Sequence, residues 1–327
     1  MPVNYIMKKQ NKKNIINQSG RIIVTGALGH IGSKLIREIS KNIAVEVVMI
    51  DNLSTQRYPS LFDLPKHLKY KFIEGDIRTL DLKKIFKGSL AVIHLAALTD
   101  AQGSIGKEEE VDSINYIGLK RVADACLATK TRLLFPSTTS VYGTQKYPVD
   151  EKFGELKPQS PYAKSKLKAE DYLLKLKKRG LQFVICRFGT IFGHSVGMRF
   201  HTAVNKFTWQ AVNNIPVTVW KTAWKQKRPY LDLKDCIKAI NFILEKDLFD
   251  GEIYNVLTKN YTVENVVETI KGFTPDLKIK LVNSPIMNQL SYDVDDTKFR
   301  KLGFKPTGDL KKGIGEKIIQ LKSIIEV

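Results

Sequence analysis

Length, composition and charge describe a chain that folds in water. It has 327 residues, of which 43% are hydrophobic and 26% charged, a mixture that allows a full core and excludes disorder throughout. At roughly 100 to 200 residues per domain, the length predicts about two compact units. No apolar run approaches the roughly 18 residues of a membrane span, and residues 1–20 lack the apolar core of a secretory signal. We therefore expect a cytoplasmic protein with no membrane partner.

The charge is strongly positive and spread along the chain. There are 53 Lys and Arg against 33 Asp and Glu, a net charge of +20, which would attract phosphorylated small molecules, nucleic acid or an anionic surface. Base-stacking aromatic residues do not alternate with the densest basic runs, so we do not expect a nucleic-acid partner. Cys126, Cys186 and Cys236 are odd in number and far apart, which predicts neither a disulfide framework nor a metal site.

From residue 21 onward, β-branched runs alternate with segments of helical periodicity. Strands are predicted at residues 21–25, 45–50, 70–73, 90–95, 132–136 and 183–188. Helices are predicted at residues 31–40, 82–86, 111–129 and 161–179. Continuous apolar strands separated by helices are typical of a parallel sheet covered on both faces. The predicted fold class is α/β, with a doubly wound parallel sheet of the Rossmann type.

The regular alternation weakens after Gly193, where glycines and prolines separate shorter elements. A helix at 233–244 and a strand at 253–256 match the sheet pattern again, so the chain is predicted to return to its first unit. The predicted division is a polar extension at 1–20, a Rossmann domain at 21–190 joined by 233–257, and a smaller α/β domain at 191–232 and 258–327.

Three glycines stand between the first strand and the first helix. Gly26, Gly29 and Gly32 permit a tight turn and close approach of a diphosphate to the helix amino end. This pattern predicts dinucleotide binding. Asp51 ends the second strand, about 25 residues past Gly26, the separation at which a carboxylate reaches the ribose hydroxyls and repels a 2′-phosphate. NAD is therefore favoured over NADP, with a loop cap as the alternative role of Asp51.

Two groups of residues could carry catalysis. Ser160 and Pro161 begin a predicted helix on which Tyr162 and Lys166 lie four residues apart on one face. An ammonium beside a phenol lowers a pKa that is otherwise about 10, so the pair could act as a general base. The Ser/Thr-rich segment at 137–140 ends the fifth strand, where it could hold a substrate oxygen or only cap its own backbone.

Taken together, these motifs resemble the extended short-chain dehydrogenase/reductases, and within them the nucleotide-sugar epimerases and dehydratases, such as UDP-glucose 4-epimerase-like proteins. The resemblance runs from about residue 21 to the carboxyl end. It rests on the segments Thr25-Gly-Ala-Leu-Gly-His-Ile-Gly32, Asp51-Asn-Leu53, Asp76-Ile77, His94-Leu-Ala-Ala97, Asn115, Ser137-Thr-Thr-Ser-Val-Tyr-Gly143, Tyr162-Ala-Lys-Ser-Lys166 and Arg187-Phe-Gly-Thr190.

The resemblance implies roles for individual residues. Tyr162 would be the base, Lys166 would lower its pKa and hold the nicotinamide ribose, and Thr138 would bind the reacting sugar oxygen. Arg228 would bind the substrate diphosphate, and Thr190 and Arg199 would face the substrate. The Rossmann domain would bind NAD and the smaller domain the substrate. The implied cofactor contacts are Gly26, Gly29, His30, Ile31, Gly32, Asp51, Asn52, Asp76, Ile77, Leu95, Ala96, Asn115, Tyr162 and Lys166.

Departures from the family pattern indicate the reaction. The family's dehydratases carry an acidic acid/base pair, or at least a Glu, at the positions held here by Thr139 and Ser140. We therefore expect an NAD-dependent epimerase of a nucleoside-diphosphate sugar, acting at C4 through a transient 4-keto intermediate, and we expect a homodimer. The alternatives are a reductase or dehydrogenase of a 4-keto sugar, and a cofactor- or RNA-binding derivative that has lost catalysis.

Overall fold

The computed structural model describes residues 20–40, 43, 45–283 and 292–325. Most of the predicted amino-terminal extension therefore lies outside the described residues. Within them, no helix is both long enough and apolar enough to span a bilayer.

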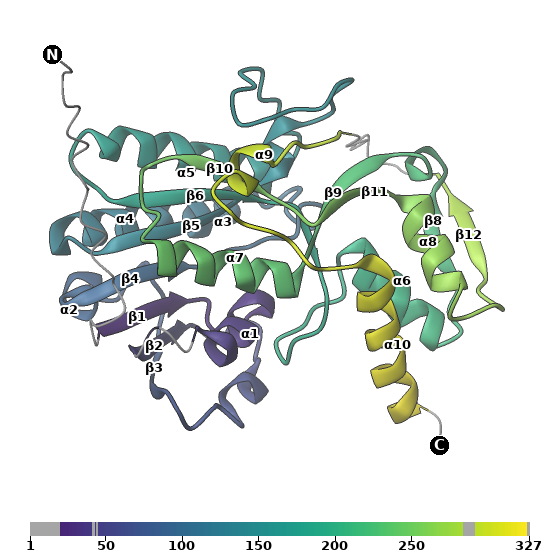
Figure 1. Cartoon of the computed structure of the whole chain (residues 1–327), viewed down its shortest axis with the longest axis horizontal. Helices are drawn as coiled ribbons and strands as arrows, with labels where there is room; N and C mark the ends of the chain where they lie inside the picture. Colours follow the sequence, from purple (N-terminus) through teal and green to yellow (C-terminus); the bar gives the residue numbers. More distant parts are fainter. Residues whose placement is uncertain (1–19, 41–42, 44, 284–291, 326–327) are drawn as a thin grey trace, which may run out of the picture.

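A seven-stranded parallel sheet forms the larger part of the molecule (Figure 1). Its strands are β1 (Gly20–Thr25), β2 (Val45–Asp51), β3 (Lys69–Glu74), β4 (Ser89–His94), β5 (Arg132–Thr138), β6 (Phe183–Phe188) and β10 (Ile253–Val256). The order across the sheet is β10-β6-β5-β4-β1-β2-β3, and every described pair is parallel. The predicted doubly wound Rossmann sheet is confirmed, and β10 joins it from far along the chain.

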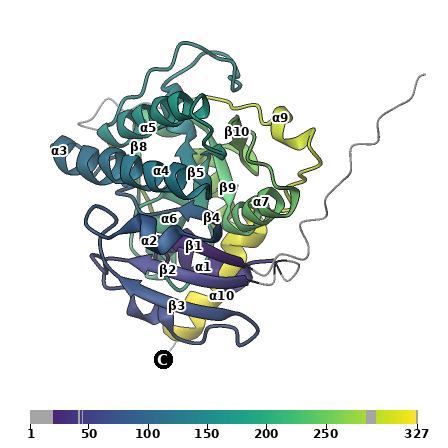
Figure 2. The ribbon, with the colours of Figure 1, turned by 90° about the vertical axis from the view of Figure 1, so that its left-hand side faces the viewer.

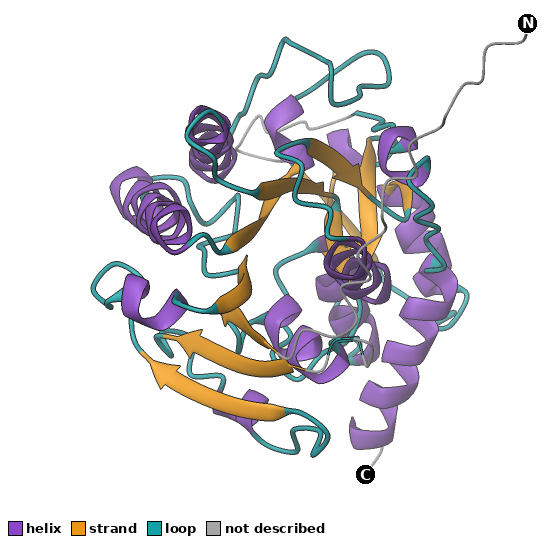
Figure 3. Ribbon diagram, turned by 60° about the vertical axis from the view of Figure 1, so that its left-hand side comes forward, coloured by secondary structure: helices purple, strands orange, loops and turns teal. Residues whose placement is uncertain are grey.

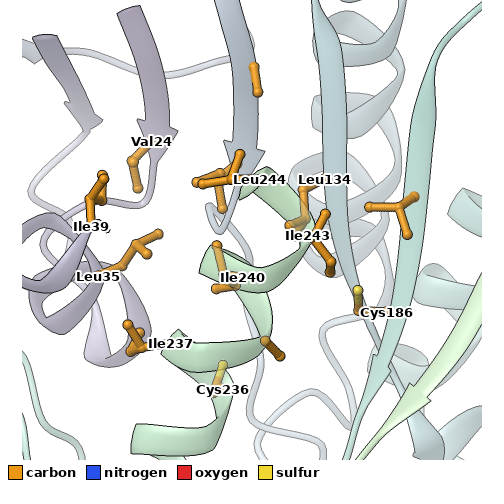
Figure 4. Packing of buried hydrophobic residues seen from close by; sticks show 14 of the residues in the cluster. Val24, Leu35, Ile39, Leu134, Cys186, Cys236, Ile237, Ile240, Ile243 and Leu244 are labelled. Atoms are coloured by element: carbon orange, nitrogen blue, oxygen red, sulfur yellow. The ribbon is translucent and has the colours of Figure 1, made fainter. Parts of the chain in front are cut away.

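Helices cover both faces of this sheet (Figures 2 and 3). Helices α1 (His30–Glu38) and α7 (Leu233–Lys246) pack on one face, and α2 (Leu82–Phe86), α4 (Gly118–Thr129) and α5 (Pro161–Lys177) pack on the other. Figure 4 shows the first of these layers, where Ile237 and Ile240 of α7 lie toward Leu35 of α1 and Ile243 lies further along α7. All four side chains are at most 2% exposed, so burial of this apolar stripe holds α7 on the sheet.

The predicted helix at 111–129 is interrupted. It consists of α3 (Glu108–Val111), a π-helical segment η3 (Asp112–Ile117) and α4. The wider turn contains Asn115, whose side chain accepts from Leu98 N and donates to Leu98 O, each at 2.8 Å. It also donates to Ser165 Oγ at 3.0 Å. The π-helical segment thus ties the loop after β4 to α5, a common use of such segments near functional sites.

Shorter elements form a second region. A mixed sheet contains β11 (Lys259–Thr262), β9 (Lys227–Asp232) and β7 (Thr190–Phe192) in that order, and β12 (Ile279–Val282) pairs with β8 (Val217–Trp220). The accompanying helices are α6 (Ala203–Val212), α8 (Val263–Lys271) and α10 (Leu310–Ile325), which share one apolar core. Single helical turns are η2 (Tyr58–Leu61), η4 (Thr139–Tyr142), η5 (Lys221–Ala223) and α9 (Thr297–Arg300). The exact domain boundaries stay a prediction.

A buried ion pair joins the main sheet to α5. Arg187 of β6 donates from Nη2 to Glu170 Oε2 at 2.7 Å and from Nε to Oε1 at 3.1 Å. The two side chains are 3% and 1% exposed, and Ser137 also donates to this carboxylate. The pair therefore fixes the end of β5 relative to α5.

We predict that Arg187→Met will lower the free energy of unfolding by about 3–5 kcal/mol, because it leaves a buried carboxylate without its cation. Urea denaturation measures the change. The double variant Arg187→Met with Glu170→Leu removes both charges and should lose clearly less stability. A single-variant loss below about 1 kcal/mol would contradict this account.

Candidate active site

A cavity of about 270 Å³ lies at the carboxyl ends of β4 and β5, beside the start of α1. The sequence-predicted site residues on its wall are His30, Ile31, Leu95, Thr138, Tyr162, Lys166, Thr190, Arg199 and Arg228. The other predicted residues lie off this wall, within the described part of the chain: Gly26, Gly29, Gly32, Asp51, Asn52, Asp76, Ile77, Ala96 and Asn115. The structure therefore brings together the predicted catalytic and substrate-binding residues.

The glycine-rich turn is a cradle that side chains would fill. Gly26 has a φ of 65°, and a Cβ on it would lie 2.6 Å from Ala96 N. A Cβ on Gly32 would lie 2.6 Å from Ala27 O, so α1 packs directly on the turn. Gly29, the N-cap of α1, has no side-chain hydrogen bond, which leaves the positive end of this helix available to an anion.

His30 is the first residue of α1 and is buried. Its Nδ1 lies 2.9 Å from Ser195 Oγ, whereas its Nε2 has no hydrogen-bond partner within the described residues. Burial lowers the pKa of His30 well below its usual value, and Arg199 lowers it further, so the ring is neutral. A neutral imidazole with one free nitrogen thus stands between the anion cradle and the cavity.

Asp51 lies at the end of β2, beside the turn. It accepts hydrogen bonds from Leu28 N and Leu53 N, each at 3.0 Å. Arg57 faces this carboxylate, and its Nη1 lies 3.8 Å from the position of a Cβ on Gly29. Burial lowers the pKa of Arg57, and Asp51 opposes that change. A carboxylate and a guanidinium therefore flank the place where a dinucleotide's ribose and phosphates are expected.

The remaining predicted cofactor contacts border β3 and α4. Asp76 accepts from Arg78 Nη2 at 2.7 Å and Nε at 3.0 Å, and this pairing lowers the pKa of Asp76 to about 2. Asn52 Nδ2 lies 3.4 Å from the same carboxylate. Ile77 is 5% exposed and packs against Gly118. The direct contact of these side chains with a ligand stays a prediction.

Tyr162 and Thr138 form a hydroxyl pair on the cavity wall. Ser160 Oγ caps α5 by accepting from Ala163 N at 3.1 Å, which sets Tyr162 in the first turn of the helix. The Tyr162 hydroxyl shares a hydrogen bond with Thr138. Lys166 lies one turn further along, where burial lowers its pKa to about 7 against the opposing charge of Glu170.

The charge that acts on the Tyr162 phenol comes from Arg199. Burial raises the pKa of Tyr162, while Arg199 and the hydrogen bond from Thr138 lower it. Lys166 instead donates from Nζ to Pro136 O at 2.8 Å. The action of Lys166 on the phenol therefore stays a prediction, and Arg199 is the cation whose charge acts on Tyr162.

The two positions after Thr138 are filled by hydroxyl groups. Thr139 is 1% exposed, and its Oγ1 lies 3.3 Å from both Phe188 O and the Tyr292 hydroxyl. Tyr292 also forms a hydrogen bond with Ser140. Burial raises the pKa of the Tyr292 phenol, so this group is protonated near neutral pH and holds no charge beside the cavity.

Arg199 places a buried cation on the cavity wall, beside a neutral His201. Arg199 donates to Thr99, while its buried Nε has no partner within the described residues. Burial and neighbouring charge lower the pKa of Arg199 to about 10 and that of His201 to about 4. Asp100, the one carboxylate among the described lining residues, acts against both shifts. The part of the cavity beside Arg199 is therefore suited to an anionic ligand.

Two more predicted substrate contacts come from the second region. Thr190 begins β7 and Arg228 lies on β9, and both line the cavity beside Tyr230. The charge of Arg228 also acts on the Tyr230 phenol, whose pKa is raised by burial and lowered by that guanidinium. A ligand in the cavity would thus contact both the main sheet and the second region.

Comparison with known proteins identifies the family. The model of the NAD dependent epimerase/dehydratase family matches residues 22–256. The chain belongs to this family. It is accordingly an NAD-dependent enzyme of the extended short-chain dehydrogenase/reductase type, as the motifs predict.

Relatives resemble the chain over nearly its whole length. An uncharacterized UDP-glucose epimerase of Bacillus subtilis, YtcB, is 29% identical over 94% of this chain and 99% of its own. The UDP-glucuronic acid 4-epimerase of Bacillus cereus, solved with UDP-glucuronic acid and NAD, is 26% identical with a TM-score of 0.84, covering 93% and 99% of the two chains. A UDP-N-acetylglucosamine 4-epimerase of Methanobrevibacter ruminantium M1 is 25% identical with a TM-score of 0.83, covering 95% and 100%.

The residues present fit NAD. The cradle at Gly26 and Gly32 admits no side chain, the amino end of α1 is uncapped by side chains, and the buried Nε2 of His30 has no partner within the described residues. Asp51 would accept the adenosine ribose hydroxyls, and the α1 amino end would hold the diphosphate.

The sequence analysis missed two residues at the site. Arg57 follows Asp51 by six positions, so a basic residue shortly after the strand-end carboxylate was an available signal. Tyr292 comes from the last part of the chain and contacts Thr139 only because of the tertiary fold. No local pattern could have indicated it.

We predict that Asp51→Ala will weaken NAD binding and narrow the preference for NAD over NADP by roughly tenfold or more, the effect of about one charged hydrogen bond. Removing the carboxylate ends its repulsion of a 2′-phosphate and frees Arg57 to attract it. Isothermal calorimetry with both cofactors measures the change.

Arg57→Met in the Asp51→Ala background is the matched control. It should abolish the gain toward NADP if Arg57 supplies the attraction. Equal affinity of the unmodified protein for the two cofactors would contradict the role given to Asp51.

Proposed function

We propose that the protein is an epimerase of a nucleoside-diphosphate sugar that inverts C4 through a transient 4-keto sugar. The observation that carries the proposal is the Tyr162–Thr138 hydroxyl pair on the wall of a cavity beside the amino end of α1. Solved relatives that act on UDP-sugars at C4 support it. The cavity's cations support a substrate that carries a diphosphate.

The chain's own residues would bind the oxygen of the sugar 4-hydroxyl and transfer its proton. NAD, when bound, supplies the acceptor and later the donor of the hydride. The Tyr162 phenolate would take the proton of the sugar 4-hydroxyl, and Thr138 would hold the same oxygen by a hydrogen bond. Arg199 stabilises the phenolate form, since it is the cation that lowers the Tyr162 pKa. When the sugar has presented its other face, Tyr162 returns the proton.

Dehydration would need further groups. Removing the C5 proton and protonating the departing 6-hydroxyl requires an acid and a base that exchange protons near neutral pH. Thr139 and Ser140 carry only hydroxyls, and both are hydrogen-bonded to the Tyr292 phenol. Epimerisation at C4 needs neither group, so the available residues favour it.

We predict that Arg199→Met will move the acid limb of the kcat–pH profile to higher pH. Removing a cation raises the pKa of Tyr162 further, so the phenolate that accepts the proton forms only at higher pH. Tyr162→Phe is the reference variant, and it should lose at least about 10²-fold in kcat while still binding NAD. A limb that stays in place in Arg199→Met would separate Arg199 from the base.

The reaction itself is tested with a panel of UDP-glucose, UDP-N-acetylglucosamine and UDP-glucuronic acid in D₂O. We expect a C4 epimer of at least one sugar by NMR, no net consumption of NAD, and no solvent deuterium at C5. Net NAD reduction or oxidation would indicate a dehydrogenase or reductase instead. Deuterium at C5, or a 4-keto-6-deoxy product, would show that another group replaces the missing acid and base.

The expected homodimer, the cytoplasmic location and the expected lack of a nucleic-acid partner remain predictions from the sequence. The cavity residues account for recognition of a small anionic substrate, but they do not bear on these three expectations.

A further inference from the structure

A buried lysine lies behind the substrate side of the cavity. Lys317 of α10 is 2% exposed and stands between Ile314 and Ile318 on the apolar face of that helix. An ammonium at such a position is unfavourable unless it is hydrogen-bonded. Its Nζ donates to Asn205 Oδ1, and burial lowers the pKa of Lys317 to about 7, with Asp232 opposing that change.

Asn205 of α6 connects Lys317 to residues 193–201, the segment that contains Arg199. It is fully buried, its Oδ1 also accepts from Gly193 N at 3.3 Å, and its Nδ2 donates to Arg199 O at 3.2 Å. Lys317 and Gly193 offer only donors, whereas the Arg199 carbonyl offers only an acceptor. All three partners therefore specify the same orientation of the amide, and the ammonium is the strongest of them.

Residues 193–201 are also held by hydrogen bonds to the first turn of α1, next to the glycine-rich turn. Gly197 N donates to Ser33 Oγ at 2.9 Å, and Ser195 Oγ lies 2.9 Å from His30 Nδ1. The Arg199 side chain adds a hydrogen bond to Thr99 but keeps a buried Nε without a partner within the described residues. Backbone anchors thus decide where this guanidinium stands relative to the cavity.

We propose that Lys317 is a positioning residue that, through Asn205, holds residues 193–201 so that the guanidinium of Arg199 faces the substrate and Tyr162. The inference rests on the proposed role of Arg199 toward the substrate. Lys317 itself does not line the cavity within the described residues. Lys317 reaches Arg199 through the hydrogen bonds of Asn205 to Gly193 N and to the Arg199 carbonyl, and its charge also acts directly on His30.

Lys317→Met tests the relay because it keeps the length of the side chain and removes the donor. Thermal stability should be unchanged or higher, since replacing a buried ammonium by an apolar side chain is often neutral or stabilising. Amide hydrogen exchange should accelerate in residues 193–201. The affinity for UDP-glucuronic acid, measured by calorimetry in the presence of NAD, should fall roughly tenfold, as for one weakened charged hydrogen bond, while NAD affinity is retained.

Asn205→Asp provides a second variant that does not depend on the folding of the first. A carboxylate still accepts from Lys317 and Gly193 but cannot donate to the Arg199 carbonyl. It should give the same faster exchange and weaker binding. Lys312→Met is the matched control, because Lys312 is exposed on the same helix, and it should change neither quantity.

A double variant separates this proposal from the proposed function. If Lys317 acts through Arg199, Lys317→Met should weaken binding no further in an Arg199→Met background. Unchanged hydrogen exchange in both Lys317→Met and Asn205→Asp would overturn the relay whatever the substrate is. If exchange is faster in Lys317→Met and Asn205→Asp but Arg199→Met binds UDP-glucuronic acid with unchanged affinity, the relay stands and Arg199 is rejected as a substrate ligand.

Discussion

The close approach of β1 and β4 at their carboxyl ends places the glycine-rich turn against the residues that follow β4. Leu95 N donates to Thr25 O at 2.9 Å, and Thr25 Oγ1 lies 2.8 Å from His94 Nδ1. A Cβ on Gly26 would collide with the chain after β4. Successive connections leave these strands in opposite directions, so a crevice opens there. It has the amino end of α1 on one side and Thr138 of β5 on the other.

The charged groups inside this crevice differ from those on the surface because they are partly or fully removed from water. Arg57 and Arg199 lower the pKa of His30, Arg57 also lowers that of Arg199, and Asp100 is the opposing carboxylate on the described wall. The net charge of +20 therefore includes a buried share that water does not screen. An anionic ligand relieves this repulsion, so its binding should stabilise the protein as well as the reaction. We therefore attribute part of the chain's positive charge to the binding of an anionic ligand.

The sequence predicts the sheet better than it predicts the site. Strands at 183–188 and 253–256 and the helix at 82–86 match the structure because each is a local apolar pattern with clear boundaries. The helix at 111–129 is wrong near its start, at residues 112–117, since a π-helical segment differs from an α-helix by one hydrogen-bond register and leaves the apolar periodicity nearly intact. Tyr292 contacts Thr139 and Lys317 contacts Asn205 from the last part of the chain, and only tertiary contact reveals them.

The glycine-rich turn after β1 and residues 193–201 pack against each other. A Cβ on Gly197 would lie 2.6 Å from Gly29 O, so the segment that carries Arg199 rests directly on the turn where the diphosphate is expected. His30 links the two, because it begins α1, contacts Ser195 and lines the cavity. A ligand that orders the first turn of α1 would therefore also restrain residues 193–201, which contact it. By linkage, a ligand that fixes residues 193–201 would then raise the affinity of the turn for its own ligand by the same factor.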